Sequence, residues 1–205
     1  MNYTEIVALA LSYADRQDSE VSDRMDNFLR VVEARINRRL KVQRMSVRTS
    51  LITKSDQEYY GLPVDFAGLR DIEIRDQTST SGGRTTLKYM SPEQMNNYSG
   101  SDSTSIYYTI IANQLQIMNP QDDKVLEIVY YRRLVPLSSA NPENWASLYD
   151  EDLYLHGLMV EISSFIKDAT AASLWETRFQ QALEEIKTDD QDSRWSGTAL
   201  EIRIG

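Results

Sequence analysis

A stretch that contains two glycines and a proline divides the chain into parts with different patterns. It covers residues 58–74. Gly61 and Gly68 can adopt positive φ, whereas Pro63 fixes its own φ and favours extended geometry at the residue before it. After Gly68, apolar and charged residues come close to the alternation of a half-buried strand. The stretch therefore predicts a turn that leads into a strand, with helices before it and a β-rich region after it.

The length and composition limit the classes of function. With 205 residues, we expect one domain with an insertion rather than two independent domains. The absence of cysteine excludes disulfides and thiolate sites. No apolar run approaches the roughly 20 residues of a membrane helix, and residues 1–30 lack the pattern of a signal peptide. We therefore expect a soluble protein made in the cytoplasm, and the net charge of −9 argues against wrapping nucleic acid.

Before residue 45, apolar residues recur every three or four positions and predict two helices. The first covers residues 3–14, and Thr4 can cap its start. The second begins at Ser19 or Ser22 and ends near Lys41, with its apolar residues in one stripe. This second helix carries arginines that project largely from the rest of its surface, namely Arg30, Arg35, Arg38 and Arg39.

Between residues 45 and 136, period-two patterns and turn residues predict a β-rich region. The expected strands begin at Met45 and then cover residues 69–75, 85–89, 106–112, 114–118 and 125–134. A short helix is expected after the cap Ser91 and Pro92, to about Tyr98. Polar tips lie at residues 77–83 and 99–105. The tight spacing of the last three strands predicts an antiparallel meander.

The last third of the chain is expected to be helical. One helix begins at Asn144 or Asp150 and ends near Lys167, and a second covers residues 169–187. The apolar positions of the second are Leu174, Trp175, Phe179, Ala182, Leu183 and Ile186. Residues 188–193 lose apolar character and are expected to be mobile. Beyond them, Leu200, Ile202 and Ile204 alternate with charged residues, as in a strand.

These elements predict an α+β fold. A helical bundle core of two N-terminal and two C-terminal helices, residues 1–44 and 137–190, is interrupted by an inserted antiparallel β-meander, residues 45–136. Residues 191–205 form an extended C-terminal arm.

Two short motifs could suggest chemistry, and each has a simpler structural interpretation. Asp150, Glu151 and Asp152 could supply paired carboxylates for glycoside cleavage. Consecutive helical positions do not face one another, however, and acids in a first turn interact favourably with the helix dipole. Gly82 and Gly83 lack the following Lys-Ser or Lys-Thr of a phosphate-binding loop, so a turn is favoured.

Two sets of ring side chains also favour structural roles. His156 is the single histidine of a chain without cysteine, so it cannot complete a typical zinc site or a cysteine-containing triad. Aromatic residues on the expected strands could stack with single-stranded nucleic acid, namely Tyr107, Tyr108, Tyr130 and Tyr131. Neighbouring tyrosines on a strand point to opposite faces, which favours packing in a sheet. We expect no cofactor and no metal.

The order of elements resembles the head-to-tail adaptor (connector) proteins of tailed bacteriophages, in particular those of short-tailed phages. The resemblance is found in five sequence segments, residues 28–40, 60–66, 130–137, 144–145 and 154–157. The resemblance implies a non-enzymatic structural protein of the virion neck. It implies a ring, commonly of about twelve subunits, that binds below the portal and extends the DNA channel towards the tail.

The charge distribution agrees with such a ring. Residues 24–48 are rich in arginine and residues 143–192 in acid, and a protomer with one basic and one acidic face can dock head to tail. The expected subunit-interface residues are Arg30, Arg35, Arg38, Arg39, Glu176, Glu184 and Glu185. Alternatively, each charge run is a solvated helix face, because exposed ion pairs contribute only about 0–1 kcal/mol.

Several partners follow from the resemblance. The arm residues Leu200, Ile202 and Ile204 are expected to bind the portal by adding to a sheet edge or lying in a groove. The alternatives are a frayed end or a strand on the same subunit. Tail or nozzle proteins, further copies of the chain and passing duplex DNA are the other expected partners, and no membrane is expected.

Two other functions stay open. A nucleic-acid-binding module would use the arginine-rich strip 30–44, and a cell-wall hydrolase would use Asp150, Glu151 and Asp152.

Overall fold

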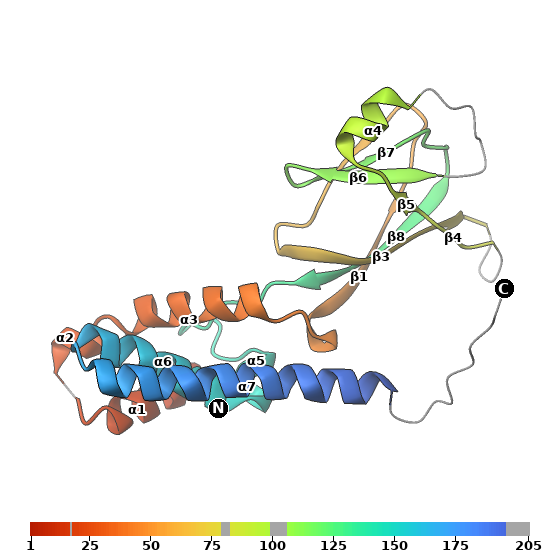
Figure 1. Cartoon of the computed structure of the whole chain (residues 1–205). Helices are drawn as coiled ribbons and strands as arrows, with labels where there is room; N and C mark the ends of the chain where they lie inside the picture. The colour runs from red at the N-terminus through yellow and green to blue at the C-terminus, as the bar shows by residue number, and fades with distance from the viewer. Residues whose placement is uncertain (17, 79–82, 99–105, 196–205) are drawn as a thin grey trace. The chain divides into compact units, whose positions relative to one another are not determined.

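The computed structural model describes residues 1–16, 18–78, 83–98 and 106–195 (Figure 1). The chain folds into two compact units. The helical unit consists of Met1–Arg44 and Leu134–Gly205, and the β unit consists of Met45–Arg133. The described residues form seven α-helices with antiparallel and mixed sheets, which confirms the α+β class.

The N-terminal part of the helical unit contains α1 (Tyr3–Tyr13), α2 (Ser19–Ser22) and α3 (Met25–Arg39). The prediction that Thr4 caps α1 is wrong, because Asn2 caps it in a capping box with Glu5. The prediction of one continuous second helix is also wrong. Asp18 caps α2, the helix ends at Ser22, and α3 begins only at Met25.

The C-terminal part contains α5 (Trp145–Tyr149), α6 (Glu151–Phe165) and α7 (Ala169–Trp195). Asn144 and Asp150 were the two candidate starts of one helix, but they begin two separate helices. Asn144 caps the short α5, and Asp150 is the N-cap residue of α6 without a side-chain cap hydrogen bond. The helix α6 packs against α1, α3 and α7 (Figure 1). The prediction that residues 188–193 are mobile is wrong, because α7 continues through them. Residues 191–195 of the predicted arm are therefore helical, and its remaining residues lie outside the described part.

Gly157 lies on α6 where side chains of both α3 and α7 come close to its backbone. A Cβ added to Gly157 would lie 2.6 Å from Val32 Cγ1 on α3 and 3.1 Å from Phe179 Cε2 on α7. Real Cβ atoms essentially never lie within 3.0 Å of another heavy atom of this kind. The missing side chain thus lets α3 and α7 approach α6 together.

The β unit consists of two four-stranded sheets, with strand orders β1-β8-β3-β4 and β2-β7-β6-β5. In chain order the strands are β1 (Ser46–Ile52), β2 (Tyr59–Gly61), β3 (Phe66–Asp76), β4 (Thr85–Thr86), β5 (Lys88–Tyr89), β6 (Tyr107–Ile111), β7 (Gln114–Ile117) and β8 (Lys124–Arg132). The helix α4 (Pro92–Asn97) begins after Ser91, as predicted.

The predicted antiparallel meander is wrong. The strands β6 and β7 form an antiparallel hairpin, but β8 lies in the other sheet, between β1 and β3. Asn119 and Asp123 have positive φ, in the connection that carries the chain from one sheet to the other. The predicted 58–74 turn also contains a strand, because β2 pairs with β7.

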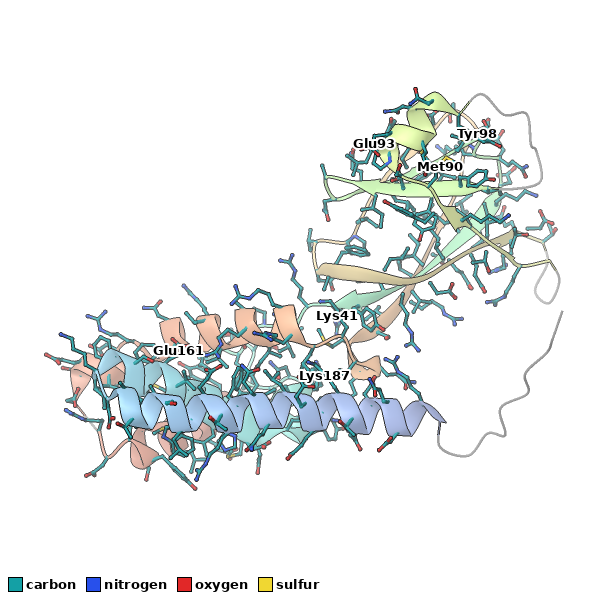
Figure 2. All side chains as sticks on the ribbon, viewed as in Figure 1. Lys41, Met90, Glu93, Tyr98, Glu161 and Lys187 are labelled. Carbon is teal, nitrogen blue, oxygen red and sulfur yellow. The ribbon has the colours of Figure 1, made fainter. Side chains whose placement is uncertain are left out.

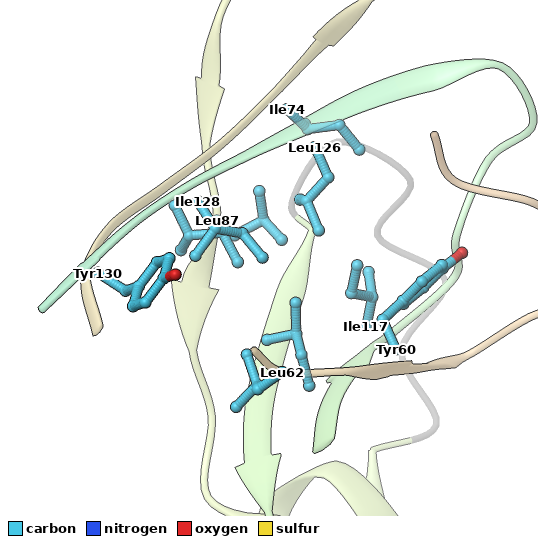
Figure 3. Close-up of a cluster of buried hydrophobic side chains, with 10 residues drawn as sticks. Tyr60, Leu62, Ile74, Leu87, Ile117, Leu126, Ile128 and Tyr130 are labelled. Atoms are coloured by element: carbon cyan, nitrogen blue, oxygen red, sulfur yellow. The ribbon is translucent and has the colours of Figure 1, made fainter. Parts of the chain in front are cut away.

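The core of the β unit is formed by side chains from both sheets (Figure 3). Tyr60 lies on β2, Leu62 directly follows β2, and Ile117 lies on β7. They belong to the same buried cluster as Leu126 and Ile128 of β8. Alternate residues of β8 therefore point into the core, as period-two spacing requires.

Among the described residues, no helix combines the length and the apolar character needed to cross a membrane.

Candidate assembly surfaces

Arg35 on α3 ties the helices of one protomer together. Its guanidinium donates to Glu176 Oε1 on α7 at 2.6 Å and to Glu161 Oε1 on α6 at 3.3 Å. Glu161 is labelled in Figure 2. It also lies 4.6 Å from the centre of the Phe179 ring. Two of the predicted interface residues, Arg35 and Glu176, are therefore partners within the chain.

Arg39 also interacts with the Glu176 carboxylate of its own chain, as the pKa of Glu176 indicates. Burial alone would raise the pKa of Glu176. Hydrogen bonds from Arg35 and Gln180, with the charges of Arg35 and Arg39, outweigh burial and hold the pKa below its ordinary value. Arg39 thus acts on Glu176 from the same chain.

A different face of α3 points to solvent and is basic. We call this face the α3 stripe, and it consists of exposed residues at helical spacing: Asn27, Arg30, Val31, Ala34 and Arg38. It contains no acid. Val31 is 44% exposed although it is apolar. The predicted interface residues Arg30 and Arg38 lie in this stripe.

The outward face of α7 carries acids. We call it the α7 stripe, and it consists of the exposed residues Thr170, Leu174, Thr177, Gln181, Glu184, Glu185 and Thr188. The Glu184 side chain is 67% exposed and accepts a hydrogen bond from Lys187 at 2.7 Å. The sequence placed Leu174 on the buried face, but it is 52% exposed. The predicted interface residues Glu184 and Glu185 lie in this stripe.

The predicted acidic run takes part in local contacts. The Arg44 guanidinium donates to Asp150 Oδ2 at 3.1 Å, and the Met1 ammonium lies 3.4 Å from Glu151 Oε2. Burial raises the pKa of Asp150, and the charge of Arg44 partly counteracts it. Asp152 is exposed in the first turn of α6, where a carboxylate interacts favourably with the positive end of the helix dipole.

Sequence reasoning missed an anchor between the end of α3 and the end of α7. The Gln43 N–H donates to Asp190 Oδ1 at 2.6 Å, and Arg44 stacks over the Tyr149 ring at 5.1 Å. Asp190 also pairs with Arg194 at 2.6 Å. The four-residue spacing of Asp190 and Arg194 is the one sequence signal that could have indicated that the helix continues there.

His156 lies on α6 against aromatic residues. Its ring centre is 5.6 Å from that of Trp175, and the Arg178 guanidinium lies 4.7 Å from the Trp175 ring. Its Nδ1 is buried and has no hydrogen-bond partner in the described part of the chain. Desolvation lowers the pKa of His156. This environment is one of packing, and the described residues hold no group of three or more His, Asp or Glu that could bind a metal.

The tyrosines of the β unit lie on separate surfaces. Tyr130 is buried and donates to Asp65 Oδ1 at 3.0 Å, whereas the neighbouring Tyr131 is half-buried. Tyr108 packs against the core, and Tyr107 contacts Tyr98 with ring centres 5.4 Å apart. The described tyrosines therefore alternate between faces. Gly83 has the positive φ of a turn, and Gly82 lies outside the described residues.

The arm residues Leu200, Ile202 and Ile204 also lie outside the described residues.

Two exposed helix faces of opposite charge on a tightly tied helical unit are typical of a structural protein that acts through surface contacts. The comparison with family profiles identifies its kind, because the SU10 adaptor protein family matches residues 1–203. The chain belongs to this family. The match confirms the resemblance at the level of a phage head-to-tail adaptor, a structural connector. The comparison with curated proteins found no match.

Proposed function

We propose that this adaptor forms an oligomeric ring that joins the portal to the tail of a short-tailed phage and extends the DNA channel. The observation that carries the proposal is the family match over residues 1–203. The ring has about twelve copies, as adaptor rings commonly do. It is made in the host cytoplasm, becomes part of the virion neck and lets duplex DNA pass during ejection.

Each part of the chain has a proposed role in this assembly. The helical segments 1–44 and 137–190 form a bundle core that carries the subunit interfaces. The β insertion 45–136 meets tail or nozzle proteins. The part of the arm after α7, residues 196–205, binds the portal through Leu200, Ile202 and Ile204. The work is done by packing and charge complementarity, so no residue is assigned a catalytic role.

The exposed charges support subunit interfaces more directly than the internal ones. Arg30, Arg38, Glu184 and Glu185 are exposed, and of these Glu184 also accepts a hydrogen bond from Lys187 on its own helix. Arg35 already binds Glu176 within its own chain and supports the interface from behind, by holding α3 against α7.

Native mass measurement of the protein, alone and mixed with its portal protein, tests the proposal. We expect a stoichiometric complex of portal with many adaptor copies. A chain that stays a monomer in the presence of the portal and the tail proteins would refute the ring.

The basic α3 stripe favours one rival function, a nucleic-acid-binding module that uses the strip 30–44. Such binding would weaken steeply with salt, because each neutralised phosphate releases counterions. We expect no binding of duplex DNA at moderate salt. Tight, salt-dependent binding that Arg30→Glu abolishes would favour the module instead.

The acidic run offers the other rival, a cell-wall hydrolase. A turnover assay on peptidoglycan with Asp150, Glu151 and Asp152 changed to amides decides it. We expect no turnover by the parent chain.

A further inference from the structure

We infer that the α3 stripe of one protomer receives the α7 stripe of a second copy, as a two-helix seam between neighbours. This inference rests on the proposed ring and names the contact that builds it. The occupant is a second copy of this chain, presenting its α7.

The first argument is the spacing of the exposed residues. The α3 stripe contains exposed positions 27, 31, 34 and 38, whose separations are four, three and four. The α7 stripe contains exposed positions 170, 174, 177, 181, 184 and 188, with the same alternation. This average of 3.5 residues is the spacing with which one helix packs along another. Both helices therefore carry a second packing seam in addition to the one that faces their own core.

The second argument is the character of the seam residues. Val31 and Leu174 are 44% and 52% exposed, whereas the large apolar residues that face the core of the unit are buried, among them Leu29, Val32 and Ile36 of α3 and Phe179 and Leu183 of α7. Ala34 lies at the middle of the α3 stripe, where a small side chain lets another helix approach closely. Covering Val31 and Leu174 removes apolar surface from water, at about 25 cal/mol per Å².

The third argument is charge. The α3 stripe carries Arg30 and Arg38 without an acid. The α7 stripe carries Glu184 and Glu185, of which Glu184 also accepts a hydrogen bond from Lys187 on the same helix. Complementary charges at an interface steer association and exclude wrong pairings, such as one α3 stripe against another.

The fourth argument is that the two stripes do not satisfy each other within one chain. The contact between α3 and α7 in the protomer runs through Arg35 and Glu176, which lie on other faces of these helices. Both stripes stay exposed. A basic seam and an acidic seam on different faces form a heterologous contact, which closes into a ring when the rotation permits.

Two charge-reversal variants of the chain test the seam, and the test does not require knowing which residue of α3 faces which residue of α7. One variant carries Arg30→Glu with Arg38→Glu, and the other carries Glu184→Arg with Glu185→Arg. Each alone places like charges at every contact, so we expect the concentration for half-assembly to rise about tenfold or more. An equal mixture restores opposite charges at every contact in an alternating ring. We therefore expect the mixture to assemble like the parent.

A matched control makes the same charge change elsewhere. Arg48 and Arg132 are exposed on strands of the β unit, and Arg48→Glu with Arg132→Glu should assemble like the parent. Circular dichroism and thermal unfolding verify that every variant is folded.

The seam is refuted if either helix variant assembles alone like the parent, or if the folded mixture fails to assemble. Failure of the parent itself to assemble, with the portal protein present, refutes the proposed ring instead. The two failures are therefore distinguishable.

Discussion

Glu33 is a buried carboxylate that holds the chain where it returns to the helical unit. Its Oε1 accepts hydrogen bonds from the Leu137 N–H at 2.7 Å and the Tyr154 hydroxyl at 3.1 Å. Burial raises the pKa of Glu33 above its ordinary value, and the two hydrogen bonds only partly counteract it. The folded chain therefore binds a proton here more tightly than the unfolded chain. The contribution to stability is fully present below the ordinary pKa and is lost as the pH rises through the folded pKa.

We predict that Glu33→Gln removes this loss. The amide oxygen can accept the same two hydrogen bonds without a buried charge, so the free energy of unfolding should rise at pH 7 and should fall less between pH 4.5 and pH 8 than in the parent. Urea unfolding between pH 4.5 and 8 measures it. Glu33→Leu is the contrast, because it leaves the Leu137 N–H unpaired at a cost of about 1–3 kcal/mol. A Gln variant clearly less stable than the parent at pH 7 would contradict the prediction.

Lys167 occupies a position that favours glycine. It follows the C-cap Ile166 of α6 with a φ of +64°, and Asp168 N–H donates to Ser163 O at 2.9 Å. This pattern is a Schellman motif, in which a residue with a Cβ is strained by the left-handed conformation.

We predict that Lys167→Gly raises the free energy of unfolding by about 0.5–1 kcal/mol, after the greater freedom of glycine in the unfolded chain is subtracted. Guanidinium unfolding provides the measurement. The control Lys167→Ala removes the charge and keeps the left-handed cost, so it should gain nothing. Equal gains in both variants would show that the lysine charge, and not the backbone, is unfavourable.

Single residues explain part of what the sequence could predict. Side-chain caps follow local rules, and Ser91 was predicted correctly. Asn144 was one of two candidates, and the helix that it caps ends at Tyr149, earlier than predicted. The internal partners of Arg35 were not predictable, because Glu161 and Glu176 lie more than a hundred positions away and only the packing of α3 on α6 and α7 brings them close. The sequence showed which residues are charged, but not which face of the helix holds each one.

Among the elements, α6 depends on Gly157. Helix propensity alone favours Gly157→Ala by about 1 kcal/mol, but the new Cβ would lie 2.6 Å from Val32 Cγ1. Overpacking of this kind costs about 1–3 kcal/mol. We predict a net loss of about 1 kcal/mol in the free energy of unfolding, measured by urea unfolding.

A double-mutant cycle separates the clash from other effects. Val32→Ala alone leaves a cavity, whereas Val32→Ala with Gly157→Ala lets the new methyl occupy part of it. The double variant should therefore be more stable than the sum of the two single changes. Strict additivity would show that Gly157 is not limited by Val32.

Element boundaries show where period-based prediction fails. Residues 188–193 carry few apolar side chains, so the apolar pattern predicted that the helix ends too early. In the structure α7 continues to Trp195, and its last turns contain the Asp190–Arg194 ion pair and the hydrogen bond from Gln43 N–H to Asp190. The strand β8 was predicted correctly as a strand but assigned to the wrong neighbours. Short spacing between two strands indicates a hairpin only when the connection is a tight turn. The strand β8 pairs instead with β1 and β3, whose residues are distant in sequence.

For the whole molecule, the order of elements was more informative than any single motif, because an adaptor has no catalytic signature to find. The family match confirms the class that this order indicated. The subunit contacts could not be predicted from the sequence, because the residues of an exposed helix face and those of a buried face recur with the same period. Only the exposure of Val31 and Leu174 separates them.

The last prediction concerns the end of the chain, residues 196–205, which follow α7. Leu200, Ile202 and Ile204 alternate with Glu201 and Arg203, a pattern that suits addition to a partner's sheet edge. We predict that deletion of residues 196–205 abolishes portal binding in a co-sedimentation assay and leaves the thermal unfolding of the chain unchanged. Leu200→Ser with Ile202→Ser and Ile204→Ser keeps the chain length and should have the same effect. Glu201→Ser with Arg203→Ser is the matched control that should still bind, because the apolar row makes the contact. Portal binding by the truncated chain would place the contact on the folded units instead.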